Sequence, residues 1–415
     1  MNPVPDLLRR GADFSFGRGR DLRVVDEVAD QLIASNQFDP RELGARALTN
    51  MIGALYENGW QPLDLHHVVR RQQNTAVAHL AAAAIAAEAD ITAAATRAPE
   101  DWLNQLSELR TAYPDARGTV DESTDFDTGS DFLTAALRAT GKTDYIAAND
   151  QWIEVLSLLG QWQLLSATHT LTPPPSQWPA RRVATASGPS SGVAADPKML
   201  VRIRGLLAKA DATEFDEEAD SFTAKAQELM TKYSIDSLSA VGGHPDVVSK
   251  RIHIDNPHAP AKAQLLHGVA EVNRVKTVWD PGYAIATVVG SIVDTRQTEI
   301  LFTSLLVQAT RALAHSSKTK RRKGAAAAAF GKAFLFSYAV RIAERLRDAD
   351  THVVEELAGV SGDLLPMLAA QSEAVGAEFD RLFPRVRTGG SPNFDAEGWD
   401  SGQAAANDAD LRRGS

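Results

Sequence analysis

The chain has 415 residues, of which 44% are hydrophobic, and a net charge of −10, so it is long enough for two or three domains with real cores. It has no cysteine, which excludes disulfides and cysteine-ligated zinc or iron–sulfur sites and fits a reducing cytoplasm. The first ten residues lack the apolar core of a signal peptide, and the Ala-rich stretch at 81–96 is too short and too weakly apolar to span a bilayer. We therefore expect a cytoplasmic protein with no membrane partner.

The N-terminal third is predicted to be helical. Residues 1–20 are rich in Arg and Gly and are expected to form a solvated tail. Apolar residues at three- and four-residue steps then predict helices through residues 21–96, with starts at Pro40 and Pro62. Residues 97–165 are less regular but carry further helical stretches. Together they predict a helical region over residues 21–170.

Residues 41–73 have the spacing of a helix-turn-helix, with two helices and a four-residue turn that contains Gly. The second helix carries Arg70 and Arg71, which are residue types that can contact nucleic acid. These arginines lie at the C-terminal end of that helix, whereas recognition helices usually read bases with their N-terminal residues. A plain helical bundle is therefore the favoured interpretation, with Arg70 and Arg71 as auxiliary candidates for nucleic-acid contact.

A linker and a helical hairpin follow. Three consecutive prolines and then a run of Ser, Gly and Ala predict a linker over residues 171–195. Asp196 can cap a helix that starts at Pro197, and apolar residues recur at helical spacing in both 197–210 and 216–233. Because the loop between these helices is short, they must pack antiparallel as an αα-hairpin over residues 196–240.

The residues of the hairpin resemble a known family. Residues 201–210, and above all the Ala-Lys-Ala-Gln-Glu-Leu-Met run at 224–230, resemble the family of domain of unknown function 2786. The regions before and after the hairpin look like those of actinobacterial members. The resemblance implies this architecture and brings no established activity or catalytic residues.

In the C-terminal region the spacing of apolar residues changes, so that alternating segments typical of strands occur between segments with helical spacing. Strands are predicted at residues 250–255, 276–279 and 283–290, and helices at 260–274, 295–315, 330–347 and 372–383. This order predicts an α+β domain over residues 247–411, in which helices cover one face of a small antiparallel sheet. The predicted fold class of the whole chain is mainly α with a C-terminal α+β domain.

Residues 318–347 are the most charge-biased segment. Glu344 is the single acid among nine bases, which are Lys318, Lys320, Arg321, Arg322, Lys323, Lys332, Arg341, Arg345 and Arg347. Such clusters bind phosphate backbones through Coulomb attraction and counterion release. Phe334 and Tyr338 alternate with these cations, as in single-strand binders, unless both rings belong to the core.

The leading hypothesis is therefore a non-catalytic protein that binds DNA or RNA through residues 318–347. One alternative is a hydrolytic enzyme that uses His253, His267 or Asp280, although Asp280 is most simply a turn residue. Another is an adaptor that binds a protein partner through the hairpin. The sequence shows no Gly-rich phosphate loop and no paired histidines at metal spacing, so no cofactor or metal is predicted.

Overall fold

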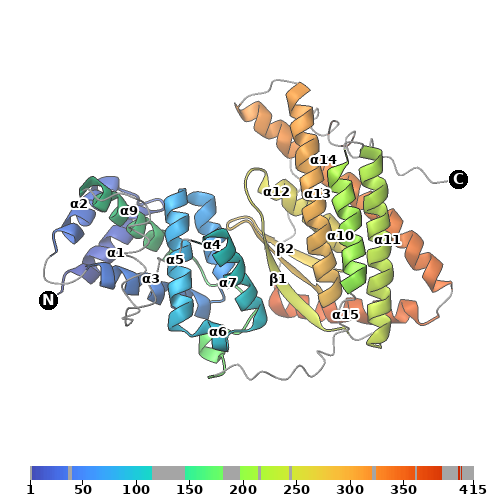
Figure 1. Cartoon of the computed structure of the whole chain (residues 1–415), viewed down its shortest axis with the longest axis horizontal. Coiled ribbons are helices and arrows are strands. Elements are labelled where there is room, and N and C mark those ends of the chain that lie inside the picture. The colour runs from blue at the N-terminus through green and yellow to red at the C-terminus, as the bar shows by residue number, and fades with distance from the viewer. Residues whose placement is uncertain are drawn as a thin grey trace. The chain divides into compact units, whose positions relative to one another are not determined.

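The computed structural model describes residues 2–35, 40–114, 145–180, 197–213, 216–242, 245–319, 324–359 and 362–385, with Ser401 and Gln403. The chain divides into two compact units, residues 1–184 and 185–415 (Figure 1). The described residues are mainly helical and include one small antiparallel sheet, which confirms the predicted fold class.

Unit 1 is a helical bundle. Its elements are α1 (Val4–Ser15), α2 (Leu22–Ile33), α3 (Pro40–Glu57), α4 (Pro62–Gln72), α5 (Thr75–Ile91), α6 (Ala94–Arg97), α7 (Glu100–Ala112), α9 (Tyr145–Trp162) and the 3₁₀ turn η2 (Pro175–Gln177). Large side chains such as Trp60, Trp102 and Trp162 fill its core. The longer helices form because their apolar residues can be buried in one bundle core, and α5 is buried at every position from Leu80 to Ala86.

The expectation of a solvated tail at residues 1–20 is wrong. Val4, Leu8 and Ala12 recur every four residues and are buried on one side of α1. The Ser15 hydroxyl donates to the carbonyl of Leu156 in α9 at 2.7 Å, so the end of α1 is also anchored. The spacing of the apolar residues therefore determines the structure of this segment, despite its Arg and Gly content.

The start of the predicted linker also packs on unit 1. The indole N–H of Trp178 donates to the carbonyl of Pro173 at 2.8 Å, and its ring meets Trp102 edge to face at 5.2 Å. Residues 181–195, the remainder of that linker, lie outside the described residues.

α5 buries an acid. Ala residues surround Glu88 along the helix, and its side chain is only 3% exposed. Burial raises the pKa of Glu88 from 4.5 to about 8, against a smaller opposing effect of a hydrogen bond with Thr92. Burial also raises the pKa of Tyr56, with a further rise from the nearby Glu88. At neutral pH the Glu88 carboxyl is therefore mostly protonated and uncharged.

Unit 2 combines the hairpin with the sheet. Its elements are α10 (Pro197–Ala212), α11 (Asp216–Ala240), β1 (Val247–His253), α12 (Ala259–Val272), β2 (Lys276–Asp280), β3 (Ile285–Ser291), α13 (Ile292–Thr319), α14 (Gly324–Ala358) and α15 (Leu364–Leu382). The strand order is β1-β3-β2, and both pairs are antiparallel. The three predicted strands are thus present.

Helices cover both faces of this sheet, whereas the sequence predicted cover on one face. Thr277 bonds to His267 of α12 at 2.8 Å, and the ammonium of Lys276 lies 5.1 Å from the ring centroid of Phe379 in α15. Because successive side chains of a strand point to opposite faces, α12 and α15 lie on opposite faces. Burial of every β3 residue agrees with this arrangement.

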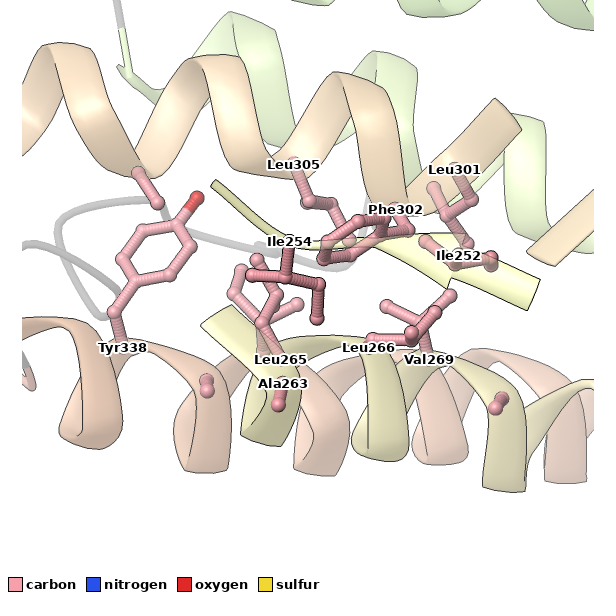
Figure 2. Packing of buried hydrophobic residues seen from close by; sticks show 14 of the residues in the cluster. Ile252, Ile254, Ala263, Leu265, Leu266, Val269, Leu301, Phe302, Leu305 and Tyr338 are labelled. Carbon is pink, nitrogen blue, oxygen red and sulfur yellow. The ribbon is translucent and has the colours of Figure 1, made fainter. Parts of the chain in front are cut away.

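One hydrophobic core holds unit 2 together. Figure 2 shows Leu265, Leu266 and Val269 of α12 facing Leu301 and Leu305 of α13 across the β1 end of the sheet. The hairpin contributes to the same core through Ile203, Leu207, Ala226 and Met230. The hairpin is therefore an integral part of the unit, because its apolar stripes are buried against α13 and α14 as well as against each other.

Of the described helices, only α14 has the length and apolar character needed to cross a membrane. Half of that apolar stretch is buried inside the protein.

Candidate functional site

The connection between α13 and α14, residues 318–323, is called the basic tip below. Past Ala309 none of the residues 310–316 of α13 is buried, and none of the residues 324–329 of α14 is buried. Both helices therefore extend beyond the core of unit 2, as Figure 1 shows. The backbone of Lys318 belongs to α13, while the candidates Lys320, Arg321, Arg322 and Lys323 lie outside the described residues.

The structure does not present the cations of α14 as one open surface. Arg341 pairs with Glu344 at 2.9 Å, and Arg347 pairs with Glu271 of α12 at 3.1 Å. Arg345 is only 6% exposed, and Lys332 is partly buried. The later part of the predicted interface is thus neutralised or covered within the unit.

The aromatic rings of α14 are core residues. Phe334 is fully buried, Tyr338 is 4% exposed, and their rings stack on each other at 6.5 Å. A base can stack only on a ring face that solvent can reach, so the interpretation of these rings as a stacking platform is wrong.

Arg70 and Arg71 belong to unit 1, at the end of α4. Residues 64–69 of this helix are all buried, and Gln161 of α9 donates to the carbonyl of Val68 at 2.8 Å. A recognition helix must insert this N-terminal half into a groove, so the structure favours a bundle helix. Arg70 is exposed and Arg71 partly buried, and neither shares a unit with the basic tip.

The residues of the hydrolase hypothesis do not meet. His253 and Asp280 flank Ile285 in neighbouring strands, so their side chains lie on one face of the sheet. His267 contacts Thr277, whose side chain lies on the other face. The Asp280 carboxylate accepts from the backbone N–H groups of Gly282 and Tyr283, which is the turn role expected for it. Among the described residues no group of three or more His, Asp or Glu is placed to hold a metal ion.

A second basic surface, which sequence reasoning missed, lies on α10. Lys198, Arg202, Arg204 and Lys209 are all exposed on this helix, and no acid lies between them in the sequence. The signal in the sequence is a local charge bias, with four bases and no acid over residues 198–209.

A buried polar network inside unit 2 was also missed. Asp294 at the start of α13 is fully buried and accepts from Ser234 at 2.5 Å, Ser291 at 2.8 Å and Gln371 at 2.5 Å. A guanidinium nitrogen of Arg274 lies 3.8 Å from the same carboxylate. The three donors come from α11, β3 and α15, and Arg274 follows α12, so Asp294 joins elements that are far apart in the sequence.

The network continues towards the middle of α11. Arg274, which has a positive φ of 60°, also pairs with Asp350 at 3.2 Å, and Asp350 accepts from Thr231 at 2.8 Å. Gln227 in turn donates to Thr231 at 3.2 Å and to Asn273 at 3.4 Å. Buried bonds of this kind are directional and costly to leave unmade, so the network specifies how the hairpin docks on α12, α13 and α14.

The comparisons with known proteins give one match, which lies in the hairpin. Residues 198–237 match the family described as protein of unknown function (DUF2786). The matched segment spans most of α10 and α11, and therefore includes both the exposed cations and Gln227. No curated protein and no solved structure matches the chain.

Proposed function

We propose that this DUF2786-family protein is a non-catalytic nucleic-acid-binding protein, and that the basic tip makes the principal contact. One observation carries the proposal. Five of the six residues 318–323 are Lys or Arg, in a chain whose net charge is −10, and they join two helices that extend past the core. Dense positive charge in one short segment of an acidic protein is suited to polyanionic phosphate backbones.

The proposed contact is smaller than the segment 318–347 suggested by the sequence. Because Arg345 is buried and Arg341 is paired with Glu344, we assign the contact to the tip and, at its margin, to Lys332. Arg70 and Arg71 are kept as a separate candidate contact of unit 1. We place the binding in the cytoplasm, since a chain without cysteine fits that compartment.

The expected affinity is electrostatic and modest. Each phosphate neutralised on duplex DNA contributes about −0.9 to the slope of log K against log salt, so five contacts correspond to a slope of about −4 to −5. Non-specific binding of this type has dissociation constants of about 10⁻⁴ to 10⁻⁶ M at physiological salt.

The test reverses the charge of the tip in the full chain. Fluorescence anisotropy with duplex DNA, single-stranded DNA and single-stranded RNA is recorded over a series of salt concentrations. The variant carries Lys320→Glu, Arg321→Glu, Arg322→Glu and Lys323→Glu. We expect it to lose binding, and any residual slope to fall by about 3 to 4 for duplex DNA.

A matched control carries four charge reversals on exposed arginines of unit 1. These side chains are between 47% and 97% exposed, and they are Arg9, Arg10, Arg23 and Arg46. Because the change in net charge is the same, a general charge effect would weaken both variants equally. Equal binding by the tip variant and the wild type would contradict the proposal.

Neither alternative gains support from the described residues. The histidines of the hydrolase hypothesis lie on opposite faces of the sheet. The adaptor hypothesis is hard to test by deleting the hairpin, because the deletion would remove part of the core of unit 2.

A further inference from the structure

The outward side of α10 is called the α10 face below. The helix packs into the unit through Leu200, Ile203, Leu207 and Ala210, all of which are buried. The opposite side is exposed and consists of Lys198, Val201, Arg202, Arg204, Gly205, Ala208 and Lys209. Val201 is 66% exposed, which is a high value for a large apolar side chain.

Neither the backbone conformation nor a close contact within the chain requires glycine at position 205. It lies in the middle of a helix without a positive φ, and a Cβ added there would meet nothing within 4 Å. Gly268 differs, because its added Cβ would lie 2.7 Å from the Cβ of Ala343. A glycine inside a helix is less stable than Ala, and no contact within the folded unit compensates for this at Gly205.

The small residues lie between cations. Val201, Gly205 and Ala208 are spaced by four and three residues and form one strip along the helix. Lys198, Arg202 and Lys209 lie along one side of that strip, and Arg204 lies on the other side. The α10 face is therefore a low, smooth surface with positive charge along both of its edges.

We propose that the α10 face is a second nucleic-acid contact, in which the strip of small residues approaches the phosphate backbone and the flanking cations bind phosphates. This inference rests on the proposed function and extends it from the basic tip to α10. Charge complementarity supports an anionic partner, since residues 198–209 contain four exposed cations and no acid, although the Lys209 ammonium also lies 5.5 Å from the ring centroid of Phe222.

The position of α10 favours nucleic acid over an acidic protein helix. Asp211 at the end of α10 accepts from Ser304 of α13 at 2.7 Å, so α10 is held against the helix that carries the tip. A long polyanion can reach two basic surfaces of one unit, whereas a single short helix cannot use both. Glu218, which accepts from Thr213 at 2.6 Å, lies beyond the C-terminal end of α10 and limits the contact to residues 198–209.

The experiment places a bulky side chain on the strip in the full chain. Because the site has open space and Leu is a better helix former than Gly, Gly205→Leu should keep or raise the thermal stability of the protein. The same variant should bind duplex DNA about tenfold or more weakly, equivalent to about 1.4 kcal/mol. The control is Gly53→Leu in α3 of unit 1, where an added Cβ also meets nothing within 4 Å. It should leave DNA binding unchanged.

A second variant, Arg202→Glu with Arg204→Glu, tests the charge of the face without adding bulk. Its salt slope for duplex DNA should fall by about 2, from the loss of two phosphate contacts.

Failure of this inference and failure of the proposed function give different results. If the wild type binds no nucleic acid, both fall. If the wild type binds, the tip variant does not, and Gly205→Leu binds as the wild type does, only the α10 face is refuted. Tighter binding of polyglutamate than of duplex DNA, lost in Gly205→Leu, would assign the face to an acidic protein and also overturn the inference.

Discussion

Glu88→Gln tests whether unit 1 buries a protonated acid. The unfolded chain ionises Glu88 near its ordinary pKa of 4.5, whereas the folded unit holds the proton up to a pH of about 8. Between these values the unfolded state binds fewer protons than the folded state, so the free energy of unfolding must fall as the pH rises. Gln keeps the shape of the side chain but cannot ionise, so this part of the pH dependence should disappear.

The magnitude follows from the same two pKa values. A difference of one pKa unit corresponds to about 1.36 kcal/mol. Relative to acid pH, Glu88 should therefore lower the free energy of unfolding by about 3 kcal/mol at pH 7 and by about 5 kcal/mol above pH 8. Such a loss is a large part of the stability of a typical domain. Wild type and Glu88→Gln should therefore be similar near pH 5, and the variant should be increasingly more stable towards pH 9.

Urea unfolding of the full chain at a series of pH values measures this difference. Tryptophan fluorescence reports mainly on unit 1, which contains five of the seven tryptophans: Trp60, Trp102, Trp152, Trp162 and Trp178. Asp90→Asn, an exposed acid two residues away on α5, serves as the control and should follow the wild type. A stability difference between Glu88→Gln and the wild type that stays constant from pH 5 to pH 9 would refute a raised pKa for Glu88.

Three further predictions concern unit 2 and use denaturant unfolding. Gly205→Ala should stabilise by about 0.5–1 kcal/mol, whereas Gly268→Ala should destabilise, because its Cβ would meet Ala343; a stability gain in both would remove the contrast between these glycines. Asp294→Ala should cost about 3–5 kcal/mol, since it leaves the buried donors of the network without their acceptor; a loss below 1 kcal/mol would show that Asp294 does not hold the hairpin in place. Phe334→Ala should lower the free energy of unfolding by about 3–5 kcal/mol, because it leaves a cavity in the core. Phe334→Leu should keep full nucleic-acid affinity, whereas loss of a ring on which bases stack would weaken binding.

Local pattern identified most elements of the fold. Strands were predicted at 250–255, 276–279 and 283–290, and they occur at Val247–His253, Lys276–Asp280 and Ile285–Ser291. The start of α14 was missed because the Ala run at 325–329 has no apolar period, although Ala is the best helix former. Pattern recognition thus failed where a helix depends on propensity and has no buried stripe.

Candidate site residues were harder to judge, because the meaning of a charge depends on its neighbours in space. Arg347 and its partner Glu271 are 76 positions apart in the sequence, and the sequence alone could not show that they pair. His253 and His267 are close in the sequence but lie on opposite faces of the sheet, since strand alternation and the position of α12 separate them.

The sequence by itself determined the helical stripes, the hairpin, the succession of helices and strands along the chain, and the charge of the basic tip. Each of these features depends on neighbours within a few positions. Tertiary structure alone decided that the hairpin shares the core of the sheet, that Asp294 accepts hydrogen bonds from three elements, and that the basic side of α10 is exposed. The physical reason is that burial and hydrogen bonding at these places join residues which only the folded chain brings together.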